Sequence, residues 1–525
     1  MDRILVTEQI GESGLQQLRK VAEVDLQLGL TPAQLKEILP GYDALVVRSQ
    51  TKVTADVLAA GTRLRVVGRA GTGVDNIDVD AATRQGILVV NAPASNSVAV
   101  AELTIGLLLA LARHIPQAHA SVREGRWERG KFMGWEVRGK TLGLVGMGRI
   151  GTEVARRARA LEMELLAYDP FISPDRAAQL GVQPAALDEL LAQSDIVSIH
   201  VPLTETTRNL FDAERMRLMK QGSYLINCSR GGIIDEAALL ELLKTGHIAG
   251  AALDVFANEP PDNSPLLDLP NVITTPHLGA STVEAQALTA ADVAEGVIAA
   301  LAGRTPHYAV NTPFVPPEEW SALAPYASLG RLLARLALQL IDTPASAYEI
   351  EYAGELAGRT PVPIRLLILQ GILEGSSDVR VTPVNAPILA RERGLQLIER
   401  SNPEAEHYAS LLRLTLITAE GERHTFSGTA LRDEPHIVQV DNYWIDLVPS
   451  QAMLFTFHRD RPGLIGRVGT ILGAADINIS SMHVGRLAPR AEAMMVLTLD
   501  EPVPSSVLHE ILSQADIERA YSVVL

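Results

Sequence analysis

The stretch TLGLVGMGRIGTEVARRARALEMELLAYD, residues 141–169, sets out a strand, a glycine-rich turn, a helix and a second strand. Gly146, Gly148 and Gly151 follow the G-x-G-x-x-G spacing directly after the apolar run LGLV. Such a turn lets backbone N–H groups and the positive end of the helix meet a pyrophosphate. Asp169 ends the second strand, where an acidic group would bind ribose hydroxyls and repel a 2′-phosphate. The stretch therefore predicts a Rossmann-type fold that prefers NAD to NADP.

The same alternation of short apolar strands and amphipathic helices fills residues 1–95 and continues beyond residue 169 to NVITTPHLG, which ends at Gly279. This pattern is typical of parallel α/β sheets, and strands that are apolar nearly throughout indicate helices on both faces. A long apolar helix is expected from about 98 to 115, and another from Ser281 to Ala302 is expected to return to the first domain. We therefore predict an α/β protein with two Rossmann-like or flavodoxin-like parallel-sheet domains.

The remaining chain has a different character. TPFVPPEEW, residues 312–320, reads as a proline-rich linker. Residues 318–450 predict an α+β segment with no catalytic constellation. Within it, a strand followed by a helix is predicted for residues 379–399, VRVTPVNAPILARERGLQLIE. The last 75 residues predict βαββαβ, the ferredoxin-like arrangement.

Composition excludes several classes of protein. A chain of 525 residues predicts two to four domains. The net charge of -16 argues against a nucleic-acid partner, so an anionic ligand must be held by a few local arginines and amides. Cys228 is the one cysteine, which excludes an intrachain disulfide and a thiolate metal cluster. The start MDRILVTEQI lacks a signal pattern, and the longest apolar run is too short to span a bilayer. We expect a soluble, cytoplasmic protein without a membrane partner or a metal.

Three side chains at strand ends are candidates for catalysis. In YLINCSRGGIIDE, Arg230 follows an apolar strand and precedes two glycines, so its planar fork could clamp a carboxylate. Gly231 and Gly232 would then let the substrate and the nicotinamide ring approach the backbone. His277 follows the strand NVITT, and Glu259 lies in a proline-stiffened loop after GAALDVF. A carboxylate beside the imidazole would fix its tautomer and keep a proton available.

Each candidate also has an ordinary structural explanation. A lone histidine often caps a helix or packs in a core, a glutamate before two prolines is usually solvated, and an arginine before glycines can cap a carbonyl. Cys228 is interpreted as a small buried residue near the cofactor. The loop GTGVDN, residues 71–76, lacks the third glycine of a nucleotide loop and is expected to face the ligand with its backbone.

Longer segments resemble a known family. LGLVGMGRIG, NCSRGGIIDE, GAALDVFANEPP and TTPHLGAST resemble the signature regions of the D-2-hydroxyacid dehydrogenase family, and GRAGTGVDNIDVDAATRQGILVVNAP resembles its phosphoglycerate dehydrogenase branch. The resemblance implies that Arg230, Glu259 and His277 are catalytic. It implies NAD contacts by Thr72, Gly146, Gly148, Arg149, Ile150, Gly151, Asp169, Val201, Cys228, Arg230, Asp254, His277 and Gly279. It implies substrate contacts by Arg48, Ser49, Gly71, Asn96, Arg129 and Lys131, the last two on a loop that in relatives can reach a neighbouring subunit.

The resemblance also implies the domain organisation of the long form of that branch. The substrate-binding domain would comprise 1–97 and 283–310, the NAD-binding domain 98–282, the intervening domain 315–450 and a C-terminal ACT domain 451–525. Such modules commonly pair, and Asp460 and Asn478 are expected to hold L-serine at the seam between two of them.

The implied activity is the NAD-dependent oxidation of 3-phospho-D-glycerate to 3-phosphooxypyruvate, which opens the phosphorylated route to L-serine, in a homodimer or homotetramer. Two alternatives stay open at this point. One is the same chemistry on another acid, such as glyoxylate or hydroxypyruvate. The other is a non-catalytic NAD-sensing protein, like the C-terminal-binding corepressors of the superfamily.

Overall fold

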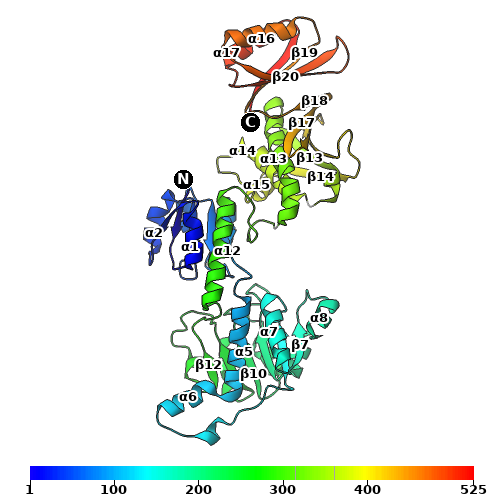
Figure 1. Cartoon of the computed structure of the whole chain (residues 1–525). Coiled ribbons are helices and arrows are strands. Elements are labelled where there is room, and N and C mark those ends of the chain that lie inside the picture. Colours follow the sequence, from blue (N-terminus) through cyan, green and yellow to red (C-terminus); the bar gives the residue numbers. More distant parts are fainter. Residues whose placement is uncertain (314, 360) are drawn as a thin grey trace.

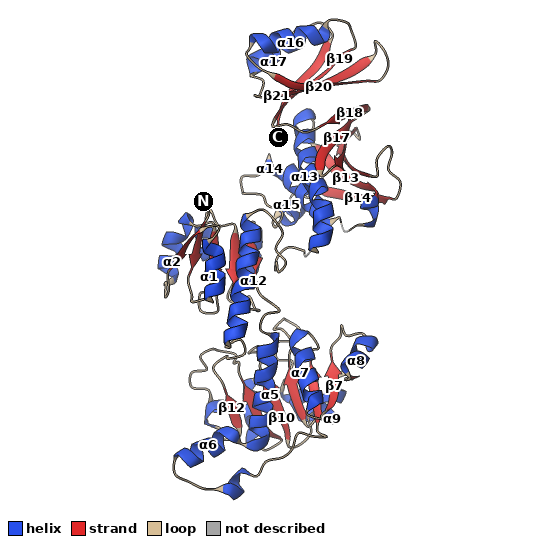
Figure 2. Cartoon of the chain, viewed as in Figure 1, coloured by secondary structure: helices blue, strands red, loops and turns tan. Residues whose placement is uncertain are grey.

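The computed structural model describes residues 1–313, 315–359 and 361–525. It arranges the chain as four units in a row, each built on one sheet (Figure 1, Figure 2). The first unit lies between the second and the third, and the fourth lies at the end far from the second (Figure 1). The order of the units in space therefore differs from their order in the sequence.

The first unit is a parallel sheet of five strands in the order β2-β1-β3-β4-β5, the flavodoxin-like order. Its elements are β1 (Arg3–Val6), α1 (Glu12–Arg19), β2 (Glu23–Leu26), α2 (Pro32–Ile38), β3 (Ala44–Val47), α3 (Ala55–Ala60), β4 (Val66–Arg69), α4 (Val79–Arg84) and β5 (Leu88–Val90). The helix α12 (Val283–Leu301) returns to this sheet, as predicted, and packs on α1 and β4. Contact with α1 is close, because a Cβ on Gly14 would lie 2.4 Å from the Ala290 carbonyl oxygen.

The second unit is a parallel sheet of seven strands in the order β12-β11-β10-β9-β6-β7-β8. Its elements are α5 (Ser97–Arg113), α6 (Ile115–Arg123), η2 (Arg129–Phe132), β6 (Thr141–Val145), α7 (Arg149–Ala160), β7 (Glu164–Tyr168), α8 (Pro174–Leu180), β8 (Gln183–Pro184), α9 (Leu187–Gln193), β9 (Ile196–Ile199), α10 (Ala213–Leu218), β10 (Ser223–Asn227), α11 (Glu236–Lys244), β11 (Ile248–Leu253) and β12 (Val272–Thr274). The direction of winding reverses between β6 and β9, which places a crevice outside the carboxyl ends of these strands. Both parallel sheets confirm the predicted fold class.

The apolar helix α5 is buried in the second unit on one side, through residues such as Leu107, Leu108 and Leu111. Among the described residues, no single helix is long and apolar enough to cross a membrane. The bent pair α5 and α6 meets that criterion only when the two are taken together, across a bend of 63°.

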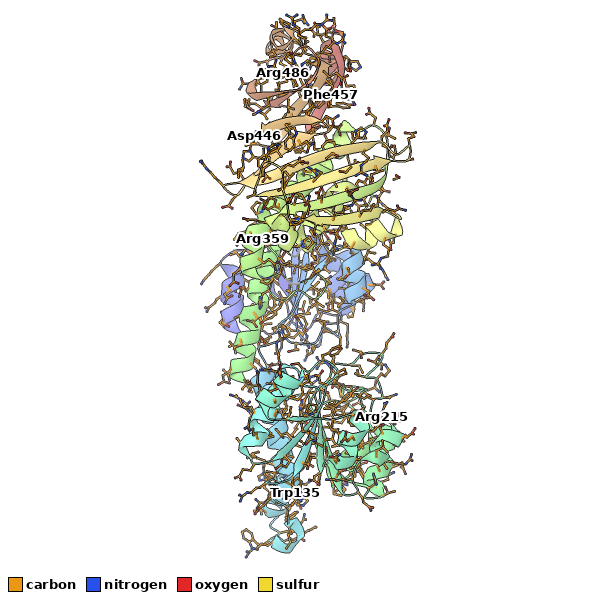
Figure 3. The ribbon with its side chains drawn as sticks, turned by 90° about the vertical axis from the view of Figure 1, so that its right-hand side faces the viewer. Trp135, Arg215, Arg359, Asp446, Phe457 and Arg486 are labelled. Atoms are coloured by element: carbon orange, nitrogen blue, oxygen red, sulfur yellow. The ribbon has the colours of Figure 1, made fainter. Side chains whose placement is uncertain are left out.

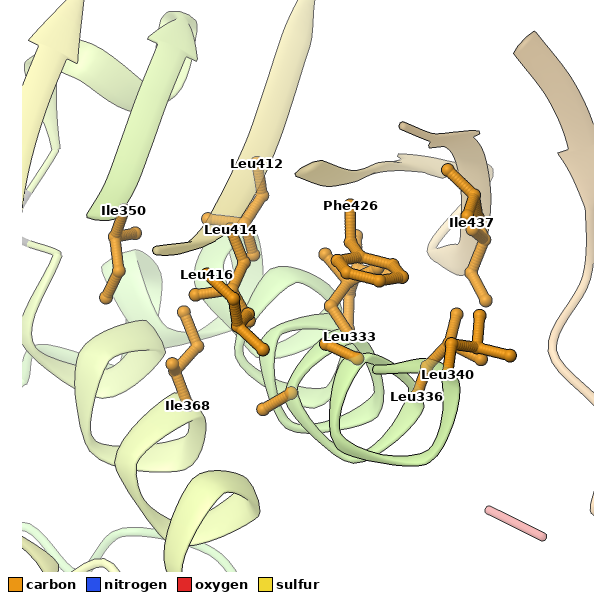
Figure 4. Packing of buried hydrophobic residues seen from close by; sticks show 14 of the residues in the cluster. Leu333, Leu336, Leu340, Ile350, Ile368, Leu412, Leu414, Leu416, Phe426 and Ile437 are labelled. Carbon is orange, nitrogen blue, oxygen red and sulfur yellow. The ribbon is translucent and has the colours of Figure 1, made fainter. Parts of the chain in front are cut away.

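The third unit is a mixed sheet of six strands in the order β14-β13-β15-β16-β17-β18. Its elements are α13 (Pro317–Leu340), β13 (Ala345–Gly354), α14 (Val362–Glu374), α15 (Ala386–Glu392), β14 (Gln396–Asn402), β15 (Ser410–Thr418), β16 (Arg423–Leu431), β17 (Glu434–Val440) and β18 (Tyr443–Leu447). The helices α13 and α14 pack on one face of the sheet. Their side chains Leu333, Leu336 and Ile368 meet Leu414 and Phe426 from the strands (Figure 4).

The predicted strand at the start of 379–399 is wrong. The structure has a turn there, then α15, and the strand β14 follows the helix instead of preceding it. The Thr382 hydroxyl donates to the Gly86 carbonyl (3.1 Å), and Asn385 Nδ2 donates to the Arg84 carbonyl (3.3 Å). The segment therefore bonds to the end of α4 in the first unit and not to a neighbouring strand.

The fourth unit confirms the predicted βαββαβ arrangement. Its elements are β19 (Ala452–Arg459), α16 (Leu464–Ala474), β20 (Ile479–Arg486), β21 (Glu492–Leu499), α17 (Ser505–Leu512) and β22 (Ile517–Val524). The sheet order is β20-β21-β19-β22 with every pair antiparallel, so β20 is an edge strand. Phe457 lies at the junction with the third unit (Figure 3). Its ring meets that of Tyr443 edge to face, with centroids 6.0 Å apart.

Candidate active site

The predicted catalytic residues lie together beyond the carboxyl ends of three neighbouring strands. Asn227, Leu253 and Thr274, the last residues of β10, β11 and β12, are in register across the sheet. Arg230, Glu259 and His277 each follow one of these ends within a short loop. In an open parallel sheet this edge is where ligands bind.

His277 and Glu259 form a direct pair. His277 Nδ1 lies 2.8 Å from Glu259 Oε2, and Glu259 Oε1 accepts from the Phe256 amide at 3.2 Å. Burial acts to raise the pKa of Glu259, but the hydrogen bond and charge of His277, the Phe256 amide and the charge of Arg230 together lower it below its usual value. Because Nδ1 is occupied by Glu259, Nε2 is the ring nitrogen available to exchange a proton with a substrate.

A buried carboxylate holds the loop that carries His277. Asp254 is fully buried and accepts from the Thr275 hydroxyl (2.6 Å) and from the amides of Leu278 (2.7 Å) and Gly279 (2.9 Å). His277 has a left-handed backbone, φ 54°, which is uncommon for a residue with a side chain. Hydrogen bonds on both sides of His277 hold this conformation and so fix the direction of the imidazole.

Arg230 lies across the opening between the first and second units. Its Nε donates to Asp75 Oδ2 in the first unit (3.0 Å), and its Nη1 donates to the Ser229 carbonyl (2.7 Å). Asn227 Nδ2 donates to the Arg230 carbonyl at 2.9 Å and fixes the turn. The guanidinium is therefore held at the place where a small anion would enter.

The glycines after Arg230 have structural roles within the protein itself. A Cβ on Gly231 would lie 1.8 Å from the Phe256 carbonyl oxygen, so the bare backbone lets the loop of Glu259 approach. Gly232 has φ 77°, a left-handed conformation that glycine adopts without strain. Both glycines therefore shape the protein itself, and their role in the approach of a ligand stays a prediction.

The first unit contributes an arginine that the sequence analysis missed. Arg69 ends β4 and is mostly buried; burial, together with the nearby charge of Arg230, lowers its pKa to about 10. Its Nε has no hydrogen-bond partner in the described structure. A Cβ on Gly71 would lie 1.7 Å from Arg69 Nη1, so Gly71 makes room for this side chain. An arginine at the end of an apolar strand is the signal that identified Arg230, and it was present here as well.

Arg48 and Ser49 lie on a neighbouring loop that a carboxylate organises. Glu8 accepts from the amides of Arg48 (2.9 Å), Gln50 (3.1 Å) and Thr51 (2.9 Å). Burial acts to raise the pKa of Glu8, and these backbone bonds outweigh it, so the pKa lies below its usual value. The charges of Arg230 and Arg48 act to lower the pKa of Arg69 and those of Asp75 and Glu8 act to raise it, so the three arginines lie in one charged region together with two acids.

The glycine-rich turn has the geometry that a dinucleotide requires. Gly146 has φ 100°, and a Cβ on it would lie 2.6 Å from the His200 carbonyl oxygen. A Cβ on Gly151 would lie 2.1 Å from the Gly146 carbonyl oxygen, so this glycine allows α7 to pack on the turn. Gly148 has open space around it, which leaves bare backbone for a pyrophosphate. These residues fit a bound NAD.

Other predicted cofactor residues surround this turn. Asp169 accepts from the amides of Met147 (2.7 Å) and Phe171 (2.9 Å), so its carboxylate lies against the loop. Arg149 and Ile150 are the first two residues of α7. The Val201 side chain lies next to Gly146, because a Cβ on Gly146 would be 2.9 Å from Val201 Cγ1. Thr72 donates its hydroxyl to Asn96 Oδ1 at 2.8 Å, at the start of α5. Burial raises the pKa of the Cys228 thiol to about 12, so the thiol is neutral at ordinary pH.

Four predicted residues lie away from this cleft. Arg129 and Lys131 are on η2, in the extension that follows α6 at the end of the second unit far from the first (Figure 1). Asp460 accepts from the Arg490 amide (3.1 Å), whereas Asn478 Nδ2 donates to Asp500 (2.8 Å). Since Arg490 and Asp500 flank β21 on either side, Asp460 and Asn478 lie at opposite ends of the sheet in one chain.

Comparisons with known proteins agree with this geometry. Residues 105–279 match the NAD-binding domain of the D-isomer specific 2-hydroxyacid dehydrogenases, 322–441 match the D-3-phosphoglycerate dehydrogenase intervening domain, and 452–516 match the ACT domain. A D-3-phosphoglycerate dehydrogenase of Synechocystis is 46% identical over 100% of this chain and 95% of its own. Another from Methanocaldococcus jannaschii is 45% identical over 97% of each chain. The chain belongs to the D-3-phosphoglycerate dehydrogenase family.

Solved structures extend this comparison to the first two units. A protein of Thermus thermophilus is 37% identical with a TM-score of 0.55, over 59% of this chain and 99% of its own. The D-lactate dehydrogenase of Escherichia coli is 29% identical with a TM-score of 0.53, over 59% of this chain and 99% of its own. This D-3-phosphoglycerate dehydrogenase family member thus shares its cleft with dehydrogenases of several small acids, and the third and fourth units are what it adds.

Proposed function

We propose that this protein oxidises 3-phospho-D-glycerate to 3-phosphooxypyruvate with NAD, the first step of the phosphorylated route to L-serine. The observation that supports it best is the meeting of the His277–Glu259 pair with three arginines at one cleft. Whole-chain relatives carry the name of this activity.

Each side of the cleft has its own part in the proposed reaction. Arg230 holds the C1 carboxylate of the substrate with its free N–H groups, which also orients the C2 hydroxyl. Nε2 of His277 takes the proton of that hydroxyl, and Glu259 stabilises the imidazolium that results. The turn of Gly146 to Gly151 would hold NAD, which would supply the acceptor for the hydride of C2. In the reverse direction the imidazolium returns the proton to the keto oxygen.

The arginines favour a phosphorylated acid over glyoxylate or hydroxypyruvate. Arg230 alone is sufficient for one carboxylate, whereas Arg48 and Arg69 offer positive charge in the first unit to a second anionic group, beside the acids Asp75 and Glu8. We assign both to the phosphate. Nε of Arg69 has no hydrogen-bond partner in the described structure, and a phosphate oxygen would supply one.

Steady-state kinetics with matched variants test this assignment. The wild type should oxidise 3-phospho-D-glycerate far better than D-lactate and reduce glyoxylate only weakly. Arg48→Gln should raise KM for 3-phospho-D-glycerate about 10- to 100-fold, the usual effect of losing a charged hydrogen bond, and leave glyoxylate reduction nearly unchanged. Lys52→Gln removes the same charge from an exposed neighbour and should change neither. Turnover of no 2-hydroxy acid would favour the non-catalytic sensor instead.

We also propose that the protein acts as a homodimer, or as a tetramer of such dimers. The extension at 115–135 exposes large apolar side chains, including Trp127 (77%) and Met133 (82%), which a neighbouring copy would cover. Arg129 and Lys131 on the same extension would then reach the partner's cleft. Sedimentation should give a multiple of the chain mass, and Trp127→Ser should shift the population toward the monomer.

The proposed regulator is L-serine, held between two ACT units. If two β20 edges pair in antiparallel fashion about a two-fold axis, Asp460 of one copy approaches the opposite end of the other sheet, where Asn478 lies. Asp460 would accept from the α-ammonium and Asn478 would bind the carboxylate or hydroxyl. Calorimetry should show heat of binding with L-serine but not with D-serine, and Asn478→Ala should abolish that heat.

The proposed location is the cytoplasm. Cys228, a free buried thiol, is compatible with that reducing compartment, where the proposed pathway would operate.

A further inference from the structure

The ion pair between Asp75 and Arg230 joins the two sides of the cleft. Asp75 belongs to the loop after β4 in the first unit, and Arg230 follows β10 in the second. The loop encloses the guanidinium closely, because a Cβ on Gly73 would lie 1.9 Å from Arg230 Nη2 and 2.6 Å from Asp75 Oδ2. The arginine of one unit is thus held by backbone and carboxylate of the other.

The residue after Asp75 anchors this loop. Asn76 is buried, and its Nδ2 donates to the carbonyls of Arg48 (2.8 Å) and Thr51 (2.7 Å). The Val53 amide donates to the Asn76 carbonyl at 2.8 Å. Asp75 is therefore tied to the loop that carries Arg48, so the carboxylate has a defined place although its side chain is 60% exposed.

The hydrogen bonds of Arg230 leave one edge of its guanidinium available. Asp75 accepts a hydrogen bond from Nε, and the Ser229 carbonyl accepts one from Nη1. Within the described structure, Nη2 makes no hydrogen bond. Glu8 and Glu259 are other acids near these arginines, and they are occupied by backbone amides and by His277, respectively. Asp75 is accordingly the carboxylate that meets Arg230, and the Nη groups remain for a ligand.

We propose that Asp75 is a positioning residue for the reaction: it holds Nε of Arg230 so that the Nη edge receives the substrate carboxylate. This inference rests on the proposed function, since it gives a fixed partner to the arginine that binds the substrate. Asp75 itself contacts neither substrate nor cofactor, and it acts through Arg230. A flexible arginine loses more side-chain freedom on binding than one already held, so the pair raises substrate affinity.

The test is a double-mutant cycle in the full-length holoenzyme. Asp75→Asn should raise KM for 3-phospho-D-glycerate about 10- to 100-fold, as expected for loss of a charge-assisted hydrogen bond, with kcat reduced much less and NADH binding unchanged. In an Arg230→Lys background the same change should cost no more than about twofold, because Asp75 acts only through Arg230. Asp80→Asn, an exposed acid on α4, is the matched control and should behave as the wild type.

A second measurement does not depend on turnover. Phenylglyoxal modification, followed at Arg230 by mass spectrometry, should be several-fold faster in Asp75→Asn than in the wild type, since the guanidinium is released toward solvent. If the wild type oxidised no acid, the proposed function would fail while the modification rates still decided the role of Asp75. Equal modification rates together with unchanged KM would overturn the inference and leave an exposed ion pair of little energetic consequence.

Discussion

Replacing Glu259 by glutamine removes the charge beside His277 and keeps the shape of the side chain. The amide oxygen can still accept from Nδ1, so the imidazole keeps its direction and Nε2 still faces the substrate. The anion that stabilises the imidazolium is lost. We expect the plateau of kcat/KM for oxidation to fall about tenfold and the rising limb of the pH–rate profile to move to lower pH, since the neutral, proton-accepting imidazole then forms more easily.

The size of the shift follows from the geometry. Two unit charges about 4 Å apart interact by about 4 kcal/mol at an effective dielectric constant of about 20. The side chains of His277 and Glu259 are 43% and 38% exposed, so solvent screening reduces this to about 1–1.5 kcal/mol. One pH unit corresponds to about 1.4 kcal/mol, and the limb should therefore move by about one unit.

Initial rates with 3-phospho-D-glycerate from pH 6 to 10, with NADH binding by fluorescence as the control, provide the measurement. A limb that stays at the wild-type pH while the plateau falls would refute the reasoning, because Glu259 would then act by shape alone.

The pH dependence of the free energy of unfolding gives an independent check. The lowered pKa of Glu259 means that its stabilising contribution is present above about pH 4.5 and is lost as the pH falls through the folded-state value. In Glu259→Gln, the free energy of unfolding should therefore fall less between neutral and acid pH than it does in the wild type.

Three further variants probe other parts of the cleft. His277→Ala should lower kcat by about 10²- to 10⁴-fold while NADH binding persists, as loss of a general base does, and wild-type rates would exclude the mechanism. Asp169→Ala should narrow the preference for NAD over NADP in kcat/KM, whereas equal use of both cofactors by the wild type would remove Asp169 from that role. Glu8→Gln should lower the free energy of unfolding by about 0.5–1.5 kcal/mol, since the Gln50 amide loses its acceptor, and should raise KM through the Arg48 loop. That loss should shrink in acid, because the lowered pKa of Glu8 confines its contribution to pH values above about 4.5.

The sequence predicts well whatever depends on neighbours along the chain. The glycine spacing of 146–151 and the carboxylate of Asp169 belong to one βαβ segment, and the structure has that segment as expected. Strand ends that are parallel must share an edge, so His277 could be placed beside Glu259 without knowledge of the rest. These predictions needed only the period of the strands and the topology of one sheet.

The missed features depend on contacts that the local sequence pattern does not show. Arg69 looked like the polar end of a strand, and Asp75 lay in a loop interpreted through its backbone alone. The segment around Thr382 has the alternation of a strand, yet its hydroxyl bonds to Gly86 nearly 300 positions earlier. Gly231 was assigned to the ligand because the sequence cannot show that the Phe256 carbonyl comes so close. Period and spacing carry no information on which distant surface a loop will meet.

The return of α12 to the first sheet also sets the order in which the chain can fold. Ala290, Val293 and Val297 of this helix share a core with Ile4 and Val6 of β1, so the first unit closes only after the whole second unit has been synthesised. The strands β6 to β12, in contrast, come from one continuous stretch and can assemble as soon as they are made. On the ribosome, the first 95 residues therefore wait with one face of their sheet uncovered while the later segment folds. Asp75 belongs to the second of the two α/β units to be completed, and its cleft with the other is formed only when α12 has docked.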